Sequence, residues 1–205
     1  MSLMDYFKAE ALLRRYGIRS VRSAYAESAH DAVRFANGKR IVLKAISRSA
    51  LHKSKSGLVM ADLDGEREIR LAYDALAKRA ARYRPFRILA QRMAGEGGIE
   101  IIVGGKTDSQ FGKLVLLGLG GVYVEAFRDF SVRVCPVGRA EAESMVMELR
   151  SRAVVAPNRR AVVMIANLIV RVSRLYSDNK ISELDLNPVI LHNGTYDAVD
   201  LRVIT

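Results

Sequence analysis

The C-terminal stretch from Lys180 onward constrains the fold most, because it contains a strong β-hairpin signal. Asn193-Gly194 separates two runs of alternating hydrophobic and polar residues, and this dipeptide between such runs is typical of a two-residue hairpin turn. With a two-residue loop, the strands pair so that Asn187 lies opposite Asp200 and Asp185 lies opposite Arg202. The sequence therefore predicts both the hairpin and its register.

The polar residues of this hairpin are expected to share one face. Side chains alternate along a strand, so Glu183, Asp185 and Asn187 point away from their leucine neighbours. Directly opposed residues have β-carbons roughly 5 Å apart, which lets the Asn187 amide oxygen and the Asp200 carboxylate reach one hard cation. Magnesium takes few protein ligands and completes its shell with water and phosphate oxygens. A nucleotide–magnesium site and a solvated polar sheet face both remain open from the hairpin alone.

The net charge of +11 and the pI near 10 favour anionic partners. Nucleotides, coenzyme A, an acidic subunit, nucleic acid and a membrane surface all fit that charge. The basic residues are dispersed and form no long block, so a solvated basic surface is the default interpretation. We expect no nucleic-acid partner, because no aromatic residues interleave with a basic stripe and no nucleic-acid-binding motif is present.

The cysteine content and the apolar segments predict a cytoplasmic protein. The single cysteine, Cys135, excludes an internal disulfide framework and suits a reducing compartment. The N-terminus lacks the apolar segment of a secretory signal. The longest apolar stretch, 161–170, contains Asn167 and is too short to span a bilayer. We therefore expect no membrane association.

The predicted elements favour an α+β fold, because helices and strands interleave without strict βαβ alternation. The chain is long enough to bury a sizeable core. A soft boundary near residues 95–98 divides the expected single domain, 1–205, into lobes of approximately 1–94 and 95–205. Helices are predicted at 5–16, 28–35, 66–84, 139–150 and 159–176. Besides the hairpin, strands are predicted at 20–24, 39–46, 58–63, 87–93, 99–103, 113–117, 122–127 and 131–134.

Two basic features are candidates for phosphate binding. Lys44 is a lone charge in a strand that otherwise reads as buried. A buried ammonium is costly unless an anion meets it, although a side chain that snorkels at a sheet edge explains it equally well. The loop 51–57 groups His52, Lys53 and Ser54. It can present cations and N–H groups to phosphates, and His52 can accept a phosphoryl group, while a solvated basic loop is the plainer explanation.

Further candidates lie in strands and in a glycine-rich turn. The segment 118–121 includes Gly120 and Gly121, where glycine allows close backbone approach to a ligand; a simple tight turn explains it as well. Gln91, Met93 and Glu100 could line an adenine slot and hold ribose hydroxyls, but by pattern they are ordinary strand residues.

Taken together, the motifs resemble the ATP-grasp β subunit of ADP-forming acyl-CoA synthetases, also called NDP-forming acetate–CoA ligases. The resemblance runs nearly end to end and in one order. It includes Ala11-Leu-Leu-Arg-Arg-Tyr-Gly17, Val42-Leu-Lys44, Leu51-His-Lys-Ser54, Gln91-Arg-Met93, Glu100-Ile-Ile-Val-Gly104, Asp108-Ser-Gln-Phe-Gly112, Gly118-Leu-Gly-Gly-Val-Tyr-Val-Glu125, Glu183-Leu-Asp-Leu-Asn-Pro188 and Ala198-Val-Asp200.

The resemblance implies an ATP-grasp fold, in which two α+β lobes clamp ATP or ADP with Mg²⁺. By similarity, Lys44 would hold phosphates, Gln91 and Met93 would border adenine, and Glu100 would face ribose. Asn187 and Asp200 would bind magnesium, and Asp185 is a third candidate ligand.

The resemblance also implies a reaction and a partner. A histidine in the position of His52 would carry phosphate between the nucleotide and a coenzyme A-binding α subunit. That subunit is expected to be a separate chain in a hetero-oligomer. Acyl-CoA, ADP and phosphate would be converted reversibly to carboxylate, coenzyme A and ATP.

Two departures from the family pattern motivate other interpretations. After Ser54 the sequence reads Lys55-Ser-Gly57, where the family has an aspartate and a glycine pair, and the segment 156–160 lacks a family glycine. A non-catalytic or regulatory nucleotide-binding module, and another ATP-grasp ligase, therefore remain alternatives.

Overall fold

The computed structural model describes residues 2–47, 57–95, 97–121 and 128–205. The chain forms two compact units, which we call the small unit, Val21–Met93, and the large unit, Met1–Ser20 together with Ala94–Thr205. The chain passes between them near the predicted boundary. The first twenty residues, however, belong to the large unit and not to an N-terminal lobe, because Leu3 forms a β-bridge with Ile204 and the first helix packs on the last strand.

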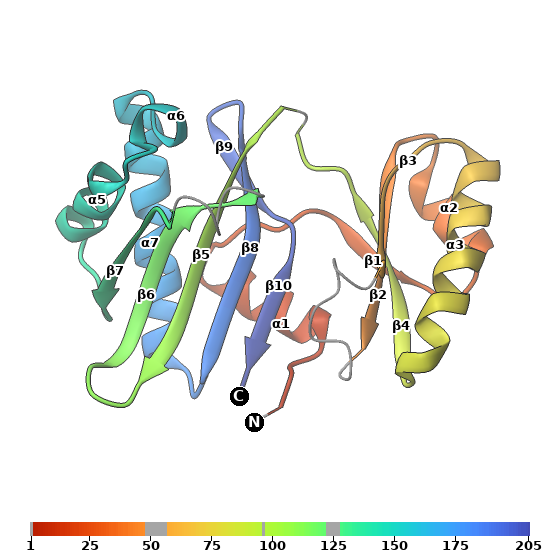
Figure 1. Cartoon of the computed structure of the whole chain (residues 1–205), viewed down its shortest axis with the longest axis horizontal. Coiled ribbons are helices and arrows are strands. Elements are labelled where there is room, and N and C mark those ends of the chain that lie inside the picture. The colour runs from red at the N-terminus through yellow and green to blue at the C-terminus, as the bar shows by residue number, and fades with distance from the viewer. Residues whose placement is uncertain (1, 48–56, 96, 122–127) are drawn as a thin grey trace. The chain divides into compact units, whose positions relative to one another are not determined.

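The small unit is a four-stranded antiparallel sheet with helices on one face (Figure 1). Its strand order is β1-β4-β2-β3. Its elements are β1 (Ser23–Ala26), α2 (Ala29–Ala36), β2 (Ile41–Ser47), β3 (Val59–Leu63), α3 (Glu66–Ala80), the 3₁₀ helix η1 (Ala81–Tyr83) and β4 (Phe86–Arg92).

The two faces of the small sheet have different roles. Ile41, Leu43 and Ala90 belong to the hydrophobic core that includes residues of α2 and α3. Since side chains alternate along a strand, Lys44 and Gln91 lie on the opposite face, and both are buried. The sheet face away from the helices of the small unit therefore carries two buried polar side chains, a lysine and an amide.

Both ends of α2 are fixed by local signals. The Ser28 hydroxyl accepts a hydrogen bond from the Asp31 N–H at 3.2 Å and caps the helix. Asn37 ends it in the left-handed conformation, with φ of 43°.

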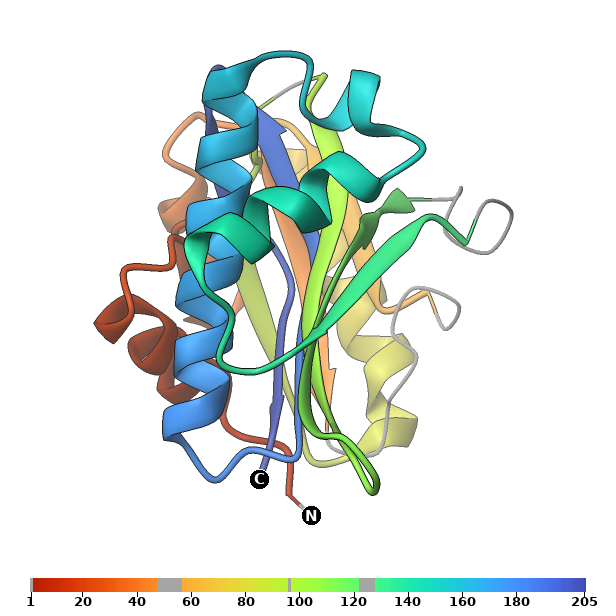
Figure 2. The same cartoon turned by 90° about the vertical axis from the view of Figure 1, so that its left-hand side faces the viewer.

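The large unit is built on a six-stranded antiparallel sheet of order β10-β8-β5-β6-β7, with β9 also paired to β8. Helices α1, α5 and α7 pack against it, and Figure 2 shows α5 and α7 on the same side of the sheet. The elements are α1 (Tyr6–Arg15), β5 (Ile99–Asp108), β6 (Gly112–Leu119), β7 (Phe130–Val134), α5 (Arg139–Glu148), α6 (Arg152–Val155), α7 (Arg159–Asp178), β8 (Glu183–His192), β9 (Thr195–Ala198) and β10 (Leu201–Ile204).

One face of the large sheet packs against α7, and the other face lies on the side away from it. Val103, Val115 and Leu117 are fully buried, and Gly105 lies so close to Tyr176 of α7 that a β-carbon there would be 3.0 Å from its ring. By strand alternation, Gly104 and Leu116 lie on the opposite face. We call that opposite face, on the side away from α7, the open face.

The predicted C-terminal hairpin and its register are confirmed. His192 pairs with Thr195 across a turn in which Asn193 and Gly194 both have positive φ, as a type I′ turn requires. The register continues into β10, where Asp185 pairs with Arg202.

Three predicted strands differ from the structure. The strand expected at 20–24 lies at Ser23–Ala26, because Ser20 forms an isolated bridge with Ala198 in the large unit. The strand expected at 99–103 continues to Asp108, because Gly104 and Gly105 pair on both sides and the second glycine makes room for Tyr176. The strand expected at 122–127 lies outside the described residues.

The helix predictions differ mainly at the ends. The helix expected at 66–84 ends at Ala80 and continues as η1 before Pro85. The short helix α6, Arg152–Val155, was not predicted.

The two ends of the chain are hydrogen-bonded to each other. The Ser2 N–H donates to the Thr205 carbonyl at 2.7 Å, and the Thr205 N–H donates to the Ser2 carbonyl at 3.0 Å. Figure 1 shows both ends at the same place beside β10. Over the described residues, the structure contains no helix with the length and hydrophobicity needed to cross a membrane.

Candidate functional site

The strongest candidate site is the middle of β8, opposite the break between β9 and β10. The Asn187 N–H donates to the Asp200 carbonyl oxygen at 3.3 Å, and the Val199 N–H donates to the Pro188 carbonyl oxygen at 3.0 Å. The Asp200 carboxylate accepts from the Leu201 N–H at 3.1 Å. These bonds hold Asn187 and Asp200 opposite each other, as the hairpin signal predicts.

Asp185 adds a second carboxylate to this site. It lies two residues before Asn187 and so on the same face of β8. Burial is the largest cause that raises the pKa of Asp185, and together with the negative charges of Asp200 and Glu183, and against the opposing charge of Arg202, it brings that pKa to about 6. A carboxylate that is buried and repelled by another carboxylate gains from a divalent cation, because the cation compensates both effects.

The donors of this site fit magnesium. No three His, Cys, Asp or Glu side chains gather into a metal-binding group in the described part of the chain. The available set is therefore the two carboxylates of Asp185 and Asp200 and the amide oxygen of Asn187. Magnesium commonly binds one or two carboxylates and keeps positions for water and phosphate oxygens, so a small oxygen set is what a magnesium–nucleotide complex needs.

The structure brings Glu100 together with the glycine-rich turn. The Gly120 N–H donates to the Glu100 carbonyl at 2.7 Å. A β-carbon at Gly120 would lie 2.9 Å from the Glu100 backbone, and one at Gly121 would lie 3.1 Å from the Glu100 carboxylate. Gly120 is therefore required by a close approach, and Gly121 by its φ of +73°. Close packing at Gly120 and backbone conformation at Gly121 therefore account for the two glycines without a ligand.

Lys44 and Gln91 share one face of the small unit. Lys44 pairs with Leu89 and Val42 pairs with Gln91 on the adjacent strands β2 and β4. The Gln91 amide donates to the Ser23 hydroxyl at 3.0 Å. Because β2 is an inner strand, Lys44 does not lie at a sheet edge. Met93 follows β4 and is 37% exposed.

The remaining predicted residues, His52, Lys53 and Ser54, lie outside the described residues.

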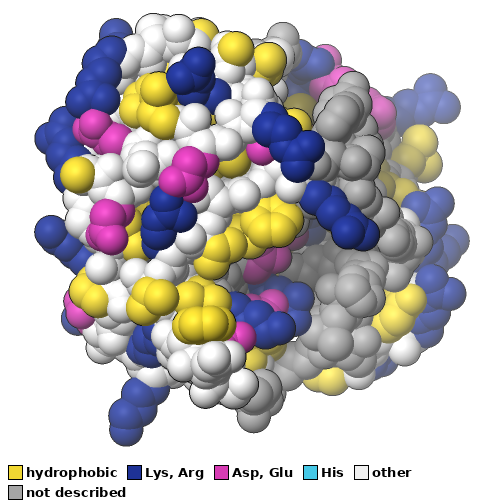
Figure 3. Space-filling view, turned by 60° about the vertical axis from the view of Figure 1, so that its left-hand side comes forward, with side chains coloured by type: hydrophobic (Ala, Val, Ile, Leu, Met, Phe, Trp, Pro, Cys, Tyr) yellow, Lys and Arg dark blue, Asp and Glu magenta, His cyan; other side chains and the backbone are white. Residues whose placement is uncertain are grey.

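The sequence did not indicate a hollow of about 460 Å³ on the open face of the large sheet. Three glycines, Gly104, Gly105 and Gly118, line it, and the other lining residues are mostly apolar. Charged residues border it as well. Its lining includes Ile102, Lys106, Leu114, Leu116, Leu119, Arg128, Phe130, Val132, Glu183 and Asp185. Figure 3 shows hydrophobic side chains lying next to both acidic and basic ones on the surface of the molecule.

The large antiparallel sheet carries the opposed amide and carboxylates, and the small α+β unit carries the buried strand lysine. An ATP-grasp domain family model matches residues 1–205. The β subunit of the ADP-forming acetate–CoA ligase I of Pyrococcus furiosus is 32% identical, over 96% of this chain and 89% of the subunit. This chain belongs to the ATP-grasp family that supplies the β subunits of ADP-forming acetate–CoA ligases.

A solved structure supports the same assignment. Acetyl-coenzyme A synthetase 1 of Ca. Korarchaeum cryptofilum has a TM-score of 0.82 and 34% identity, covering 99% of this chain and 92% of that one. That structure contains coenzyme A and Mg-AMPPCP, with a phosphohistidine segment pointing towards the nucleotide-binding site.

The relatives differ in length. The ADP-forming acetate–CoA ligase I of Archaeoglobus fulgidus is 35% identical over 94% of this chain, but the chain spans only 30% of that ligase. The matched domain therefore occurs both as a subunit and as part of a longer chain.

Proposed function

We propose that this chain is the nucleotide-binding part of an ADP-forming acyl-CoA synthetase. It binds ATP or ADP with Mg²⁺ and exchanges phosphate with a histidine relay. A coenzyme A-binding α subunit, a separate chain in a hetero-oligomer, completes the reaction. Acyl-CoA, ADP and phosphate are converted reversibly to carboxylate, coenzyme A and ATP.

The observation that carries this proposal is the group of Asp185, Asn187 and Asp200. Burial and like charge raise the pKa of Asp185 to about 6, and the opposed strand pairs bring all three side chains to one region of the sheet. A magnesium ion held there supplies positive charge that orients nucleotide phosphates and neutralises their negative charge. Asp185, Asn187 and Asp200 would determine where the magnesium ion is bound.

Four further residues are assigned to the nucleotide by the family resemblance. We assign phosphate binding to Lys44, the adenine border to Gln91 and Met93, and ribose binding to Glu100. Lys44 is buried in an inner strand, and its place in Val42-Leu-Lys44, one of the motifs that carry the resemblance, supports its assignment. Gly120 and Gly121 support Glu100 through the close contact described above.

We assign the phosphoryl relay of this chain to His52, with Lys53 and Ser54 binding the phosphate beside it. An imidazole nitrogen can accept a phosphoryl group at neutral pH. The similarity to ADP-forming ligases supports this assignment, since the motif Leu51-His-Lys-Ser54 is one of those that carry the resemblance.

Calorimetric titration of the chain with ATP and ADP, with and without Mg²⁺, tests the proposal. We expect binding that requires or is strongly enhanced by magnesium. Binding of nucleotide that is unaffected by magnesium contradicts the assignment of Asp185, Asn187 and Asp200. If magnesium–nucleotide binding occurs but no acyl-CoA synthesis follows on addition of a coenzyme A-binding subunit, the chain is a nucleotide-binding module without catalysis.

A further inference from the structure

A surface on α5 and α6 combines exposed apolar side chains with arginines. Arg139, Glu143 and Met147 are spaced four residues apart and therefore form one stripe along α5. Arg152 of α6 contacts this stripe, because its guanidinium lies 3.9 Å from the Met147 sulfur. Met147 is 49% exposed, and Val154 of α6 is 59% exposed. The arginine surface, as we call it, consists of these five residues and Arg159 of α7, which pairs with Glu143.

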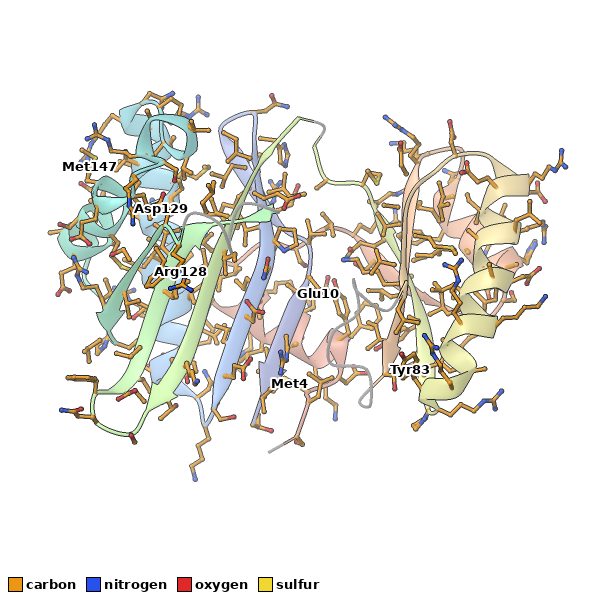
Figure 4. The ribbon with its side chains drawn as sticks, viewed as in Figure 1. Met4, Glu10, Tyr83, Arg128, Asp129 and Met147 are labelled. Atoms are coloured by element: carbon orange, nitrogen blue, oxygen red, sulfur yellow. The ribbon has the colours of Figure 1, made fainter. Side chains whose placement is uncertain are left out.

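Asp129 fixes the arginine surface to the large sheet. The Asp129 carboxylate accepts hydrogen bonds from the Arg150 N–H at 2.9 Å and the Ser151 N–H at 2.8 Å, between α5 and α6. The Asp129 carbonyl accepts from the Leu119 N–H of β6 at 3.1 Å. Asp129 also lines the hollow of the candidate site. Figure 4 shows Asp129 and Met147 at the same end of the large unit. The arginine surface is therefore held in place and adjoins the candidate site.

The charges of the arginine surface do not balance. Glu143 pairs with Arg139 at 3.2 Å and with Arg159 at 2.7 Å. Among the residues that the structure describes, Arg152 contacts a sulfur and forms no ion pair. One carboxylate thus serves three guanidinium groups. The surface keeps a net positive charge, which favours a partner that brings carboxylates of its own.

The composition of the surrounding sequence indicates that this partner is a protein. Residues 114–179 contain nine arginines and no lysine, whereas the rest of the chain contains fifteen arginines and nine lysines. Arginine and methionine are enriched in protein–protein interfaces, and lysine is depleted. A guanidinium is more weakly hydrated than an ammonium and forms two parallel hydrogen bonds to a carboxylate. The exposed Met147 and Val154 side chains also need an apolar partner, which the sugar–phosphate backbone of a nucleic acid does not offer.

We propose that the arginine surface docks the coenzyme A-binding partner chain, through a segment in which aspartate or glutamate flanks an apolar residue. This inference rests on the function proposed above, which requires such a chain. The apolar residue covers Met147 and Val154, and the acidic residues pair with Arg152 and Arg159. Docking at this place brings the partner next to the hollow, because Asp129 contacts the turn between α5 and α6 and lines the hollow as well.

The test measures association of the full chain with the coenzyme A-binding subunit by analytical ultracentrifugation, and Mg·ADP affinity by calorimetry. We expect Arg152→Glu to weaken association at least about tenfold, because it removes a charge-assisted hydrogen bond and adds a like charge. Met147→Ser should also weaken association, and both variants should retain Mg·ADP affinity. The matched controls are Arg67→Glu and Leu71→Ser, at exposed positions of α3 in the small unit, which should change neither quantity.

Ionic strength separates docking from a merely structural role. Association of the parent chain should weaken as salt is added, because salt screens the pairing of arginines with carboxylates. Arg152→Glu should show a shallower dependence on salt than the parent chain, since one of these pairs is missing. Met147→Ser should keep the dependence of the parent chain, because it removes apolar contact and no charge. Equal salt dependence in Arg152→Glu and the parent chain would overturn the pairing with carboxylates.

The outcomes separate this inference from the proposed function. If Arg152→Glu and Met147→Ser associate as the parent chain does, the docking surface is wrong and the proposed function stands. If both variants lose Mg·ADP affinity in parallel with association, the surface supports the fold, which also overturns the inference. If they instead weaken binding of single-stranded DNA and leave subunit association unchanged, the class of partner is wrong. A parent chain that associates with the subunit without binding Mg·ADP contradicts the proposed nucleotide site alone.

Discussion

Asn187 and Asp200 lie opposite each other on β8 and the approach to β10, with the Asn187 N–H donating to the Asp200 carbonyl at 3.3 Å. That hydrogen bond joins backbone atoms only, so the strand geometry, and not the bond, sets the directions of the two side chains. The side chains can therefore be changed without removing the bond that fixes the register.

Asp200→Asn should weaken nucleotide binding only in the presence of magnesium. The substitution keeps the size of the side chain and removes one negative charge from the metal site. We expect a loss of at least about tenfold in Mg·ATP affinity, equivalent to about 1.4 kcal/mol, measured by calorimetry. Asp108→Asn, at the far hairpin of β5 and β6, is the control. An equal loss with and without magnesium would indicate a structural role for Asp200.

His52→Ala should abolish acyl-CoA synthesis with a coenzyme A-binding partner and retain binding of Mg·ATP. An alanine cannot accept a phosphoryl group, whereas the nucleotide contacts assigned to Lys44 and Asn187 do not involve the imidazole. Coupled turnover and calorimetry on the same preparation make the comparison. Turnover equal to that of the parent chain would remove His52 from the relay.

Gly194→Ala should destabilise the chain by about 1–2 kcal/mol, the cost of placing a non-glycine residue in the left-handed region. Gly194 has a φ of +72°, and a β-carbon there would lie 3.3 Å from the Arg160 guanidinium. Gly112→Ala is the matched control, with a φ of +75° in another hairpin of the same sheet and no atom within 4 Å. Urea unfolding should show Gly194→Ala to be at least as destabilising as Gly112→Ala. A larger destabilisation by Gly112→Ala than by Gly194→Ala would show that the Arg160 side chain moves away from the added methyl group without cost.

Lys113→Met should destabilise the large unit by about 2–3 kcal/mol, as expected for hydrogen bonds from a charged donor. The Lys113 ammonium donates to the carbonyls of Tyr176, Ser177 and Asn179 at 2.6, 3.1 and 2.6 Å. Lys113, on the neighbouring strand β6, therefore provides hydrogen-bond donors for the carbonyls at the C-terminal end of α7. Thermal or urea unfolding is the measurement, with the exposed Lys180→Met as control. A loss no larger than that of the control would show that water replaces the ammonium without cost.

The stability contributed by Asp129 should disappear in acid. Burial alone raises the pKa of this carboxyl, but hydrogen bonds from Ser151 and Arg150 outweigh it and the pKa is lowered. A lowered pKa in the folded state adds stability above the ordinary value near 4, and that stability is lost as the pH falls through the lowered pKa. Asp129→Asn should therefore be destabilised at pH 7 and approach the parent chain below about pH 4. Urea unfolding across this range checks it, and a difference independent of pH would contradict the electrostatic origin.

The hairpin and the opposed positions of Asn187 and Asp200 could be predicted from the sequence because the spacing around the turn fixes them. A two-residue turn determines which residues are opposed, and strand alternation determines which side chains share a face. These two rules together are enough to place Asn187 opposite Asp200.

The hollow could not be predicted by the same reasoning. It depends on Gly104 and Gly118 lying near each other across two strands, and a glycine in a strand has no pattern that distinguishes a packing site from a ligand site. Gly105 lies beside Gly104 and makes room for Tyr176 instead. Asp129, which also lines the hollow, accepts hydrogen bonds from backbone N–H groups more than twenty positions away, and local sequence signals do not report such contacts.

The hydrogen bonds between Ser2 and Thr205 have a consequence for how this domain can be joined to others. Because the two ends leave the fold as neighbouring strands, about 5 Å apart, a domain fused before residue 2 and one fused after residue 205 would emerge side by side. The domain can therefore be inserted into a loop of another protein with little strain on the host. A short peptide linking the ends would allow new termini to be opened elsewhere. For an enzyme family in which the same domain occurs as a subunit and as a segment of a longer chain, such an arrangement makes the two gene architectures structurally interchangeable.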